Sequence, residues 1–140
     1  MADLEASLKN LKNAFERLEE FVTLPVSTMR DQAGIIQAFE FTFELFWKTF
    51  QKMAPWHGLL ADTPRAALRA GLQMGYIRLE DEATWLEMLK DRNLTSHVYQ
   101  KQLADEIFER VVERYVPVFR DTLERVEKMA ESQIPTYPAK

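Results

Sequence analysis

Apolar residues recur at steps of three and four along the start of the chain, with charged and amide side chains between them. This spacing places the apolar positions on one face of a helix and the polar ones toward water. The stripe consists of Leu4, Leu8, Leu11, Phe15, Leu18 and Val22. Pro25 ends this first helix, and Ser27 or Thr28 can cap a second one that runs to about Lys52.

The second predicted helix, 28–52, contains the stretch FEFTFELFWKTF, whose apolar side chains cover nearly the whole circumference. A helix that is apolar all round is buried on most sides. In a chain of this length, we therefore expect it to be central, or to have part of its surface against another subunit.

Three charged residues interrupt this apolar surface at four-residue steps and form a single polar line: Glu40, Glu44 and Lys48. One interpretation is a ladder of ion pairs within the helix. The other is that Glu44 orients Arg92 or His97 across the bundle, because a buried carboxylate commonly has such a partner.

Two shorter helices are predicted in the middle of the chain. APWHGLL reads as a loop, and Asp62 or Thr63 then caps a third helix that ends near Gly75. A fourth helix is expected over 81–91, with an apolar side formed by Trp85, Met88 and Leu89.

The last helix is expected to begin near Val98, with a kink or break at Pro117. Residues 131–140 are polar with two prolines and are predicted to be a flexible tail, which leaves 1–130 as a single helical domain. No period-two pattern of strands competes with the helical spacing. The predicted fold is all-α, an antiparallel bundle of four to five helices.

Composition narrows the possible functions. The chain has 140 residues, 46% of them hydrophobic, and no apolar run long enough for a membrane span. The absence of cysteine excludes disulfides, thiolate catalysis and Cys-based zinc sites. The net charge of −4 argues against a non-specific nucleic-acid coat protein, although a small basic pocket is compatible with it. Without a signal-peptide pattern at the N-terminus, we expect a cytoplasmic protein with no membrane association.

The stretch RNLTSH and the residues after it bring Arg92, His97 and Tyr99 within eight positions. It can be an ordinary polar turn, in which Arg92 ends the fourth helix and Thr95 or Ser96 caps the next. It can also be a phosphate site, with a guanidinium fork, a proton-exchanging imidazole and the N-terminal amides of the following helix. In the first interpretation, Tyr99 packs beside the last helix. In the second, its phenol contacts the ligand.

In the second interpretation, these groups suit cleavage of RNA without a metal. His97 would exchange the proton and Arg92 would stabilise charge on the phosphorane oxygens. One histidine does not easily serve as both base and acid, so a two-fold dimer with both motifs in one cleft is expected. His57 has no neighbours at metal-ligand spacing, and no phosphate-binding glycine loop is present. Neither a metal nor a cofactor is therefore predicted.

Three blocks of sequence, EFTFELFWKTF, TPRAALRAG and WLEMLKDRNLTSHVY, resemble the small helical proteins called nucleotidyltransferase substrate-binding proteins. These belong to the HEPN superfamily and are relatives of the HepT toxins. The resemblance extends from Leu4 to Val126. It implies a HEPN-like dimeric bundle, with Arg92 and His97 facing a shared cleft.

For activity, the resemblance implies the toxin of a toxin–antitoxin pair, a metal-independent endoribonuclease with Arg92 and His97 as catalytic residues. A minimal nucleotidyltransferase would be its antitoxin, silencing it by transferring AMP to Tyr99. Glu44 is the candidate for the acidic residue on an earlier helix, and further supporting residues are Lys48, Asp91 and Asn93. The alternative is a non-catalytic subunit that binds a substrate or nucleotide for a separate nucleotidyltransferase.

Overall fold

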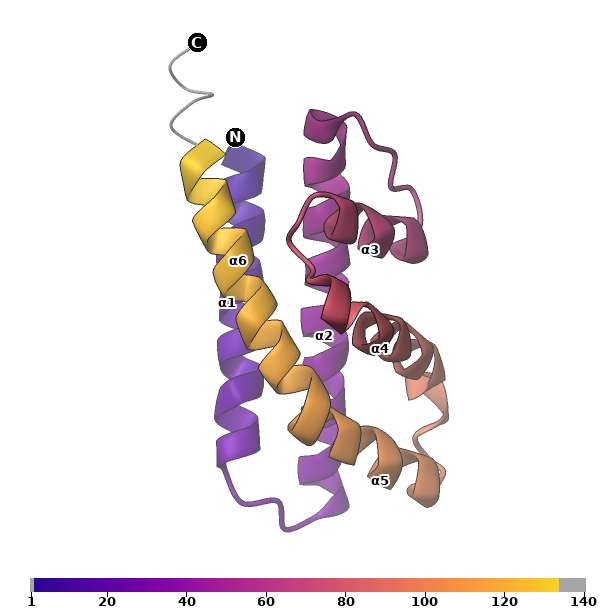
Figure 1. Ribbon diagram of the computed structural model, residues 1–140. Helices are drawn as coiled ribbons and strands as arrows, with labels where there is room; N and C mark the ends of the chain where they lie inside the picture. Colours follow the sequence, from indigo (N-terminus) through magenta and orange to yellow (C-terminus); the bar gives the residue numbers. More distant parts are fainter. Residues whose placement is uncertain (1, 134–140) are drawn as a thin grey trace.

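The computed structural model describes residues 2–133, and within this range the chain is all helical (Figure 1). The helices are α1 (Ala2–Thr23), α2 (Met29–Met53), α3 (Pro64–Gln73), α4 (Glu82–Leu94), α5 (Lys101–Arg110) and α6 (Val116–Gln133). The predicted all-α bundle is confirmed. Most of the predicted tail, 134–140, lies outside the described residues, whereas 131–133 belong to α6.

Helix α2 lies in the middle of the bundle. Figure 1 shows α1 and α6 side by side along one side of α2 and running in opposite directions, with α3 and α4 on the other side. The start of α1 and the end of α6 are therefore at the same end of the molecule. No helix in the described range has the length and apolar character that a membrane crossing requires.

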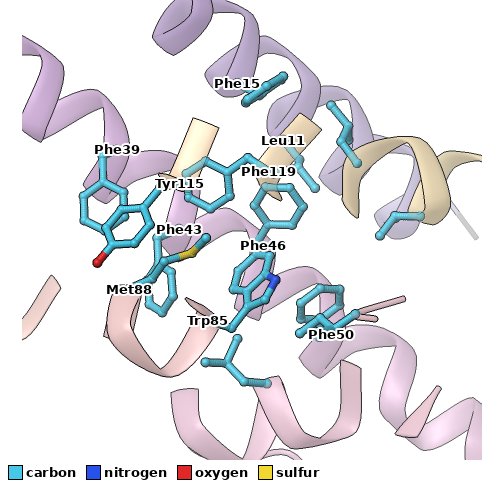
Figure 2. Packing of buried hydrophobic residues seen from close by; sticks show 14 of the residues in the cluster. Leu11, Phe15, Phe39, Phe43, Phe46, Phe50, Trp85, Met88, Tyr115 and Phe119 are labelled. Atoms are coloured by element: carbon cyan, nitrogen blue, oxygen red, sulfur yellow. The ribbon is translucent and has the colours of Figure 1, made fainter. Parts of the chain in front are cut away.

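The aromatic side chains of α2 explain its central place. Phe39, Phe43, Phe46 and Phe50 are fully buried. The Phe46 ring is central to the cluster in Figure 2, with its centroid 5.1 Å from those of both Trp85 on α4 and Phe119 on α6. Aromatic pairs at such distances add to the free energy gained by burying their apolar area. The prediction that this helix is central is confirmed.

The predicted starts of α2 and α3 are also confirmed. Thr28 Oγ1 accepts a hydrogen bond from the backbone amide of Asp31 at 3.2 Å, and the Asp31 carboxylate accepts from the backbone amides of Thr28 and Ser27. These two backbone hydrogen bonds hold the pKa of Asp31 below its usual value. At α3, Thr63 Oγ1 accepts from the amide of Ala66 at 3.1 Å. Both starts are N-caps of the kind that satisfy otherwise unpaired amides.

Two predictions about the segments between helices need correction. The segment after α2, expected to be a loop, contains a 3-10 turn at Ala54–His57, which Gly58 ends with a φ of 73°. The last helix begins at Lys101 and not near Val98, because Thr95–His97 form a 3-10 turn of their own. Helix α5 lacks a side-chain cap, so the expected cap at Thr95 or Ser96 is wrong.

The expected break at Pro117 takes the form of a π-helical segment. Residues Val111–Tyr115 join α5 to α6, and the amide of Val116 donates to the carbonyl of Val111, five residues earlier. Pro117 has no N–H to continue the α-helical ladder, so the wider turn lies directly before it. The two helices meet at a bend at this point (Figure 1).

Two helical glycines should respond in opposite directions to replacement by alanine. A Cβ at Gly71 would lie 3.0 Å from the Phe50 ring, which is buried and stacked on Tyr76, whereas a Cβ at Gly34 would meet nothing within 4 Å. We expect Gly71→Ala to lower the free energy of unfolding by about 1–2 kcal/mol through overpacking. Gly34→Ala should raise it by about 0.5–1 kcal/mol through helix propensity. Urea denaturation of both variants measures these changes, and equal effects at the two positions would contradict the packing at Gly71.

Candidate functional site

A surface hollow of about 510 Å3 lies between α2 and the end of α4. Side chains from α2, from the last turn of α4 and from the 3-10 turn after it line the hollow: Glu40, Phe41, Glu44, Arg92, Asn93, Thr95 and Ser96. The hollow is shallow and wide open to solvent. Three residues predicted for the site are therefore brought together here, namely Arg92, Glu44 and Asn93.

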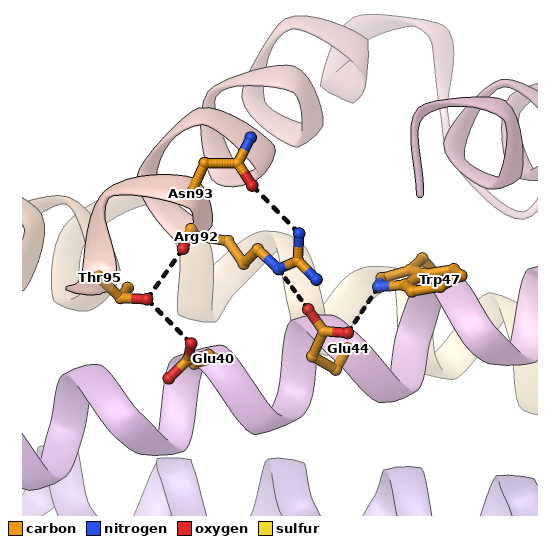
Figure 3. Close-up of polar contacts among 6 residues, drawn as sticks. All are labelled: Glu40, Glu44, Trp47, Arg92, Asn93 and Thr95. Carbon is orange, nitrogen blue, oxygen red and sulfur yellow. Dashed lines mark hydrogen bonds and ion pairs between the residues drawn. The ribbon is translucent and has the colours of Figure 1, made fainter. Parts of the chain in front are cut away.

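Arg92 is held at both ends of its guanidinium group (Figure 3). Its Nε donates to Glu44 Oε1 in an ion pair, and its Nη1 donates to Asn93 Oδ1 at 3.1 Å. The other Glu44 oxygen accepts from Trp47 Nε1 at 3.0 Å, so the carboxylate is also fixed. Glu44 thus contacts Arg92 across the bundle, as one of the two interpretations of the polar line expected.

Only part of the hydrogen-bonding capacity of Arg92 is used. An arginine carries five N–H donors in a planar fork. The two bonds to Glu44 and Asn93 leave three N–H groups with no partner in the described part of the chain. With its side chain 29% exposed, Arg92 is a pre-oriented donor that an oxyanion in the hollow can reach.

Thr95 joins the 3-10 turn to α2. Its Oγ1 lies 2.9 Å from Glu40 Oε2 and 2.8 Å from the carbonyl oxygen of Arg92. A hydroxyl has one proton, so Thr95 donates to one of these acceptors at a time. This use of the hydroxyl explains why Thr95 does not cap α5. The N-terminal amides of α5 consequently begin four residues beyond the turn and do not line the hollow.

Asp91, predicted to support the site, lies outside the hollow and links α4 to α5 and to the π segment. Its carboxylate is 2% exposed and accepts from Arg110 Nε at 2.7 Å and from Arg110 Nη2 at 2.8 Å. Tyr115 in the π segment donates its hydroxyl to the same carboxylate. Consecutive residues on a helix point about 100° apart. By fixing α4 against the π segment, Asp91 directs Arg92 toward α2.

The contacts of Asp91 also raise the pKa values of its two partners, Arg110 and Tyr115. Burial, and then the hydrogen bond to Asp91, raise the pKa of Tyr115 well above its usual value. The hydrogen bond to Asp91 raises the pKa of Arg110 as well. Tyr115 therefore stays a neutral donor, and Arg110 stays a cation.

His97 and Tyr99 do not line the hollow. His97 ends the exposed 3-10 turn, and Tyr99, 78% exposed, lies just after it with its ring centroid 6.2 Å from that of His97. Lys48 is likewise outside the hollow, with its Nζ 5.9 Å from the centroid of the Trp47 ring. Within one chain, His97 is thus not among the residues that line the hollow around Arg92. The cleft that Arg92 and His97 would share in a dimer stays a prediction.

Charge in the hollow is unbalanced toward acid. One guanidinium, Arg92, faces the two carboxylates of Glu40 and Glu44. The site thus offers both donors and acceptors, which suits a ligand with mixed hydrogen bonding better than a polyanion. Within residues 2–133, no three acidic or imidazole side chains gather as metal ligands would.

Four of the residues that line the hollow were not predicted for the site: Glu40, Phe41, Thr95 and Ser96. The sequence indicated Phe41 as one of several core aromatics of α2, and nothing in its local spacing distinguished it from the buried ones. Arg65 and Arg69 line a different and smaller cavity between α3 and α4.

A family model described as nucleotidyltransferase substrate binding protein like matches residues 6–128. The chain belongs to this family. A crystal structure of a protein from Thermus thermophilus is similar, with 32% sequence identity and a TM-score of 0.75. The match covers 83% of this chain and 98% of that one. No curated protein matches the chain.

Membership of the nucleotidyltransferase substrate binding protein-like family agrees with the resemblance carried by the three sequence blocks. The match includes α2, α4 and the 3-10 turn, and so contains the whole hollow around Arg92. Assignment to the HepT toxin branch stays a prediction.

Proposed function

We propose that this chain is the nucleotide- or substrate-binding subunit of a two-protein nucleotidyltransferase, and that the hollow around Arg92 is where it binds. The observation that carries the proposal is the pre-oriented guanidinium of Arg92, with three N–H groups open to a ligand. A phosphate oxygen is a fitting acceptor for such a fork. The family to which the chain belongs is described by substrate binding for a nucleotidyltransferase.

Binding is favoured over cleavage by the composition of the hollow. A strand of RNA brings several phosphates, and the carboxylates of Glu40 and Glu44 oppose them. Cleavage also needs a proton-transfer group within hydrogen-bond reach of the reacting oxygen. His97 lies outside the hollow in the single chain, whereas Arg92 is inside it.

The second candidate function is a metal-independent endoribonuclease toxin. It is favoured by the exposure of His97, at the end of the 3-10 turn, and of Tyr99 just after it, beside the helix end that carries Arg92. A homodimer would bring two such turns into one cleft and supply a second imidazole. The nucleotidyltransferase partner would then be an antitoxin that transfers AMP to the exposed hydroxyl of Tyr99.

A pair of assays on the purified chain separates these functions. We expect AMP to bind in isothermal titration calorimetry, and single-stranded RNA to stay intact in metal-free buffer. The proposal also expects a nucleotidyltransferase gene beside the gene for this chain, and the product of that gene should co-purify with the chain. Metal-free RNA cleavage that disappears in His97→Ala, together with an AMP-sized mass gain on Tyr99 in the presence of the partner, would select the toxin instead. If the chain neither binds AMP nor retains the partner, the binding-subunit proposal is wrong.

A further inference from the structure

Phe41 differs from the other phenylalanines of α2. Its side chain is 56% exposed, whereas Phe39, Phe43, Phe46 and Phe50 are fully buried. It is also the single aromatic residue among those that line the hollow around Arg92. An exposed ring next to polar ligand-binding groups provides an apolar face on which a planar ligand can stack.

Glu40, the residue before Phe41, has a carboxylate oxygen available to the same ligand. Its Oε2 accepts from Thr95, and its Oε1 has no partner in the described part of the chain. An ionised carboxylate accepts hydrogen bonds and cannot donate them. It therefore selects a ligand edge that carries an amino group and disfavours one that carries only carbonyl oxygens.

We propose that this hollow recognises the base of the bound nucleotide, with Phe41 stacking on the ring and Glu40 accepting from an exocyclic amino group. Adenine, cytosine and guanine carry an exocyclic amino group on the Watson–Crick edge, whereas hypoxanthine, the base of inosine, and uracil have none. The amino-bearing bases are therefore the preferred ones. The inference rests on the proposed function, because it assumes that the nucleotide phosphate is bound by Arg92.

The two ends of the hollow, one at Glu40 and the other at Arg92, are placed to bind the base and the phosphate of one nucleotide. Glu44, which holds Arg92, lies four residues after Glu40, so the two carboxylates are about 6 Å apart along the α2 axis. The base would occupy the end of the hollow at Glu40 and Phe41, and the phosphate the end at Arg92. This orientation also keeps the phosphate away from the open oxygen of Glu40, which would otherwise repel it.

Another occupant of this surface has to be distinguished. Phe41 also lines a second, partly apolar hollow between α1 and α2, which contains Phe21 together with Arg17 and Gln37. A protein surface that covers this hollow would bury Phe41 without any nucleotide. Replacing Phe41 would then change the oligomeric state or partner binding and leave nucleotide affinity unchanged.

The test compares three ligands, AMP, inosine monophosphate and inorganic phosphate, by calorimetry and by shifts in NMR spectra. For the parent chain, we expect the affinity for AMP to be at least about ten times the affinity for inosine monophosphate. Phe41→Ala and Phe41→Leu should each weaken the binding of AMP about tenfold, since both remove the aromatic face. The affinity for inorganic phosphate should stay unchanged. Glu40→Gln should abolish the preference for AMP over inosine monophosphate.

Met29→Ala is the matched control, because Met29 is 70% exposed on α2 and lies outside the hollow. It should leave all three affinities unchanged. If the parent and Phe41→Ala bind AMP equally, or if the parent does not discriminate between AMP and inosine monophosphate, the inference is overturned while phosphate binding at Arg92 still supports the proposed function. If the parent binds neither AMP nor phosphate, the proposed function fails, and this inference fails with it.

Discussion

Replacing Asp91 with alanine is expected to lower the free energy of unfolding by about 3 kcal/mol or more, the largest change in stability foreseen for this chain. Asp91 is 2% exposed and satisfies two donors of Arg110 and the hydroxyl of Tyr115. Without it, a partly buried guanidinium and a buried phenol lose their acceptor. Removing one member of a buried ion pair is strongly destabilising, because the other charge stays behind uncompensated.

Urea denaturation followed by circular dichroism at neutral pH measures this change. Glu19→Ala is the control: it breaks the ion pair with Arg120, whose side chains are 35% and 50% exposed, and should cost less than about 1 kcal/mol. Tyr115→Phe should have an intermediate effect, since it removes one of the three hydrogen bonds. A loss for Asp91→Ala as small as the loss for Glu19→Ala would show that the Asp91 cluster does not hold α4 in place.

The raised pKa of Tyr115 also predicts how stability depends on alkaline pH. In the folded chain the phenol ionises at a higher pH than in the unfolded chain. The stabilisation is therefore fully present below the unfolded-state value, near 10, and is lost as the pH rises above it. In Tyr115→Phe, the free energy of unfolding should therefore fall less steeply as the pH rises above about 10.

Local sequence signals predicted the elements that depend on neighbouring residues. Thr28 followed by Asp31 is a capping box, and the residues needed to recognise it lie within one helical turn. Pro117 predicted an interruption because its missing N–H acts on its own helix. The apolar circumference of 28–52 predicted a central helix, since no other position buries it.

The site depended more on contacts between distant residues, and its prediction was less complete. Glu44 and Arg92 are 48 positions apart, so spacing alone left the ion-pair ladder and the cross-bundle contact equally open. Asp91 was expected beside Arg92 in the site. Its partners are Arg110, the last residue of α5, and Tyr115 in the π-helical turn that follows, which no local pattern reveals. They draw its side chain away from the hollow.

The start of the last helix shows the same limit. Thr95 is a favoured N-cap residue, and a helix starting near Val98 followed from that preference. In the folded chain, its hydroxyl contacts Glu40 from α2 and the carbonyl of Arg92 instead. A tertiary contact therefore overrides a local propensity. It also leaves His97 in a 3-10 turn, outside the hollow.

Arg92→Ala is expected to weaken AMP binding about 100-fold, the largest functional effect foreseen. The variant removes the open N–H groups that face the ligand, and charge-assisted hydrogen bonds of this kind contribute about 1.5–3 kcal/mol each. It also leaves Glu40 and Glu44 as two uncompensated carboxylates in the hollow, which repel a phosphate. Arg92→Lys should recover part of the affinity, since it restores the charge without the planar fork that Glu44 and Asn93 orient.

Calorimetry with AMP, beside Arg120→Ala as the control, measures the effect of replacing Arg92. Arg120 is an arginine paired with a glutamate, as Arg92 is, but it lies on α6 and contacts α1, so its loss should leave AMP affinity unchanged. A lysine variant that binds as tightly as the parent would mean that only the charge of Arg92 matters. Glu44 would then have no orienting role. Equal AMP affinity in Arg92→Ala and the parent would place the phosphate elsewhere, because no other cation lines this hollow within residues 2–133.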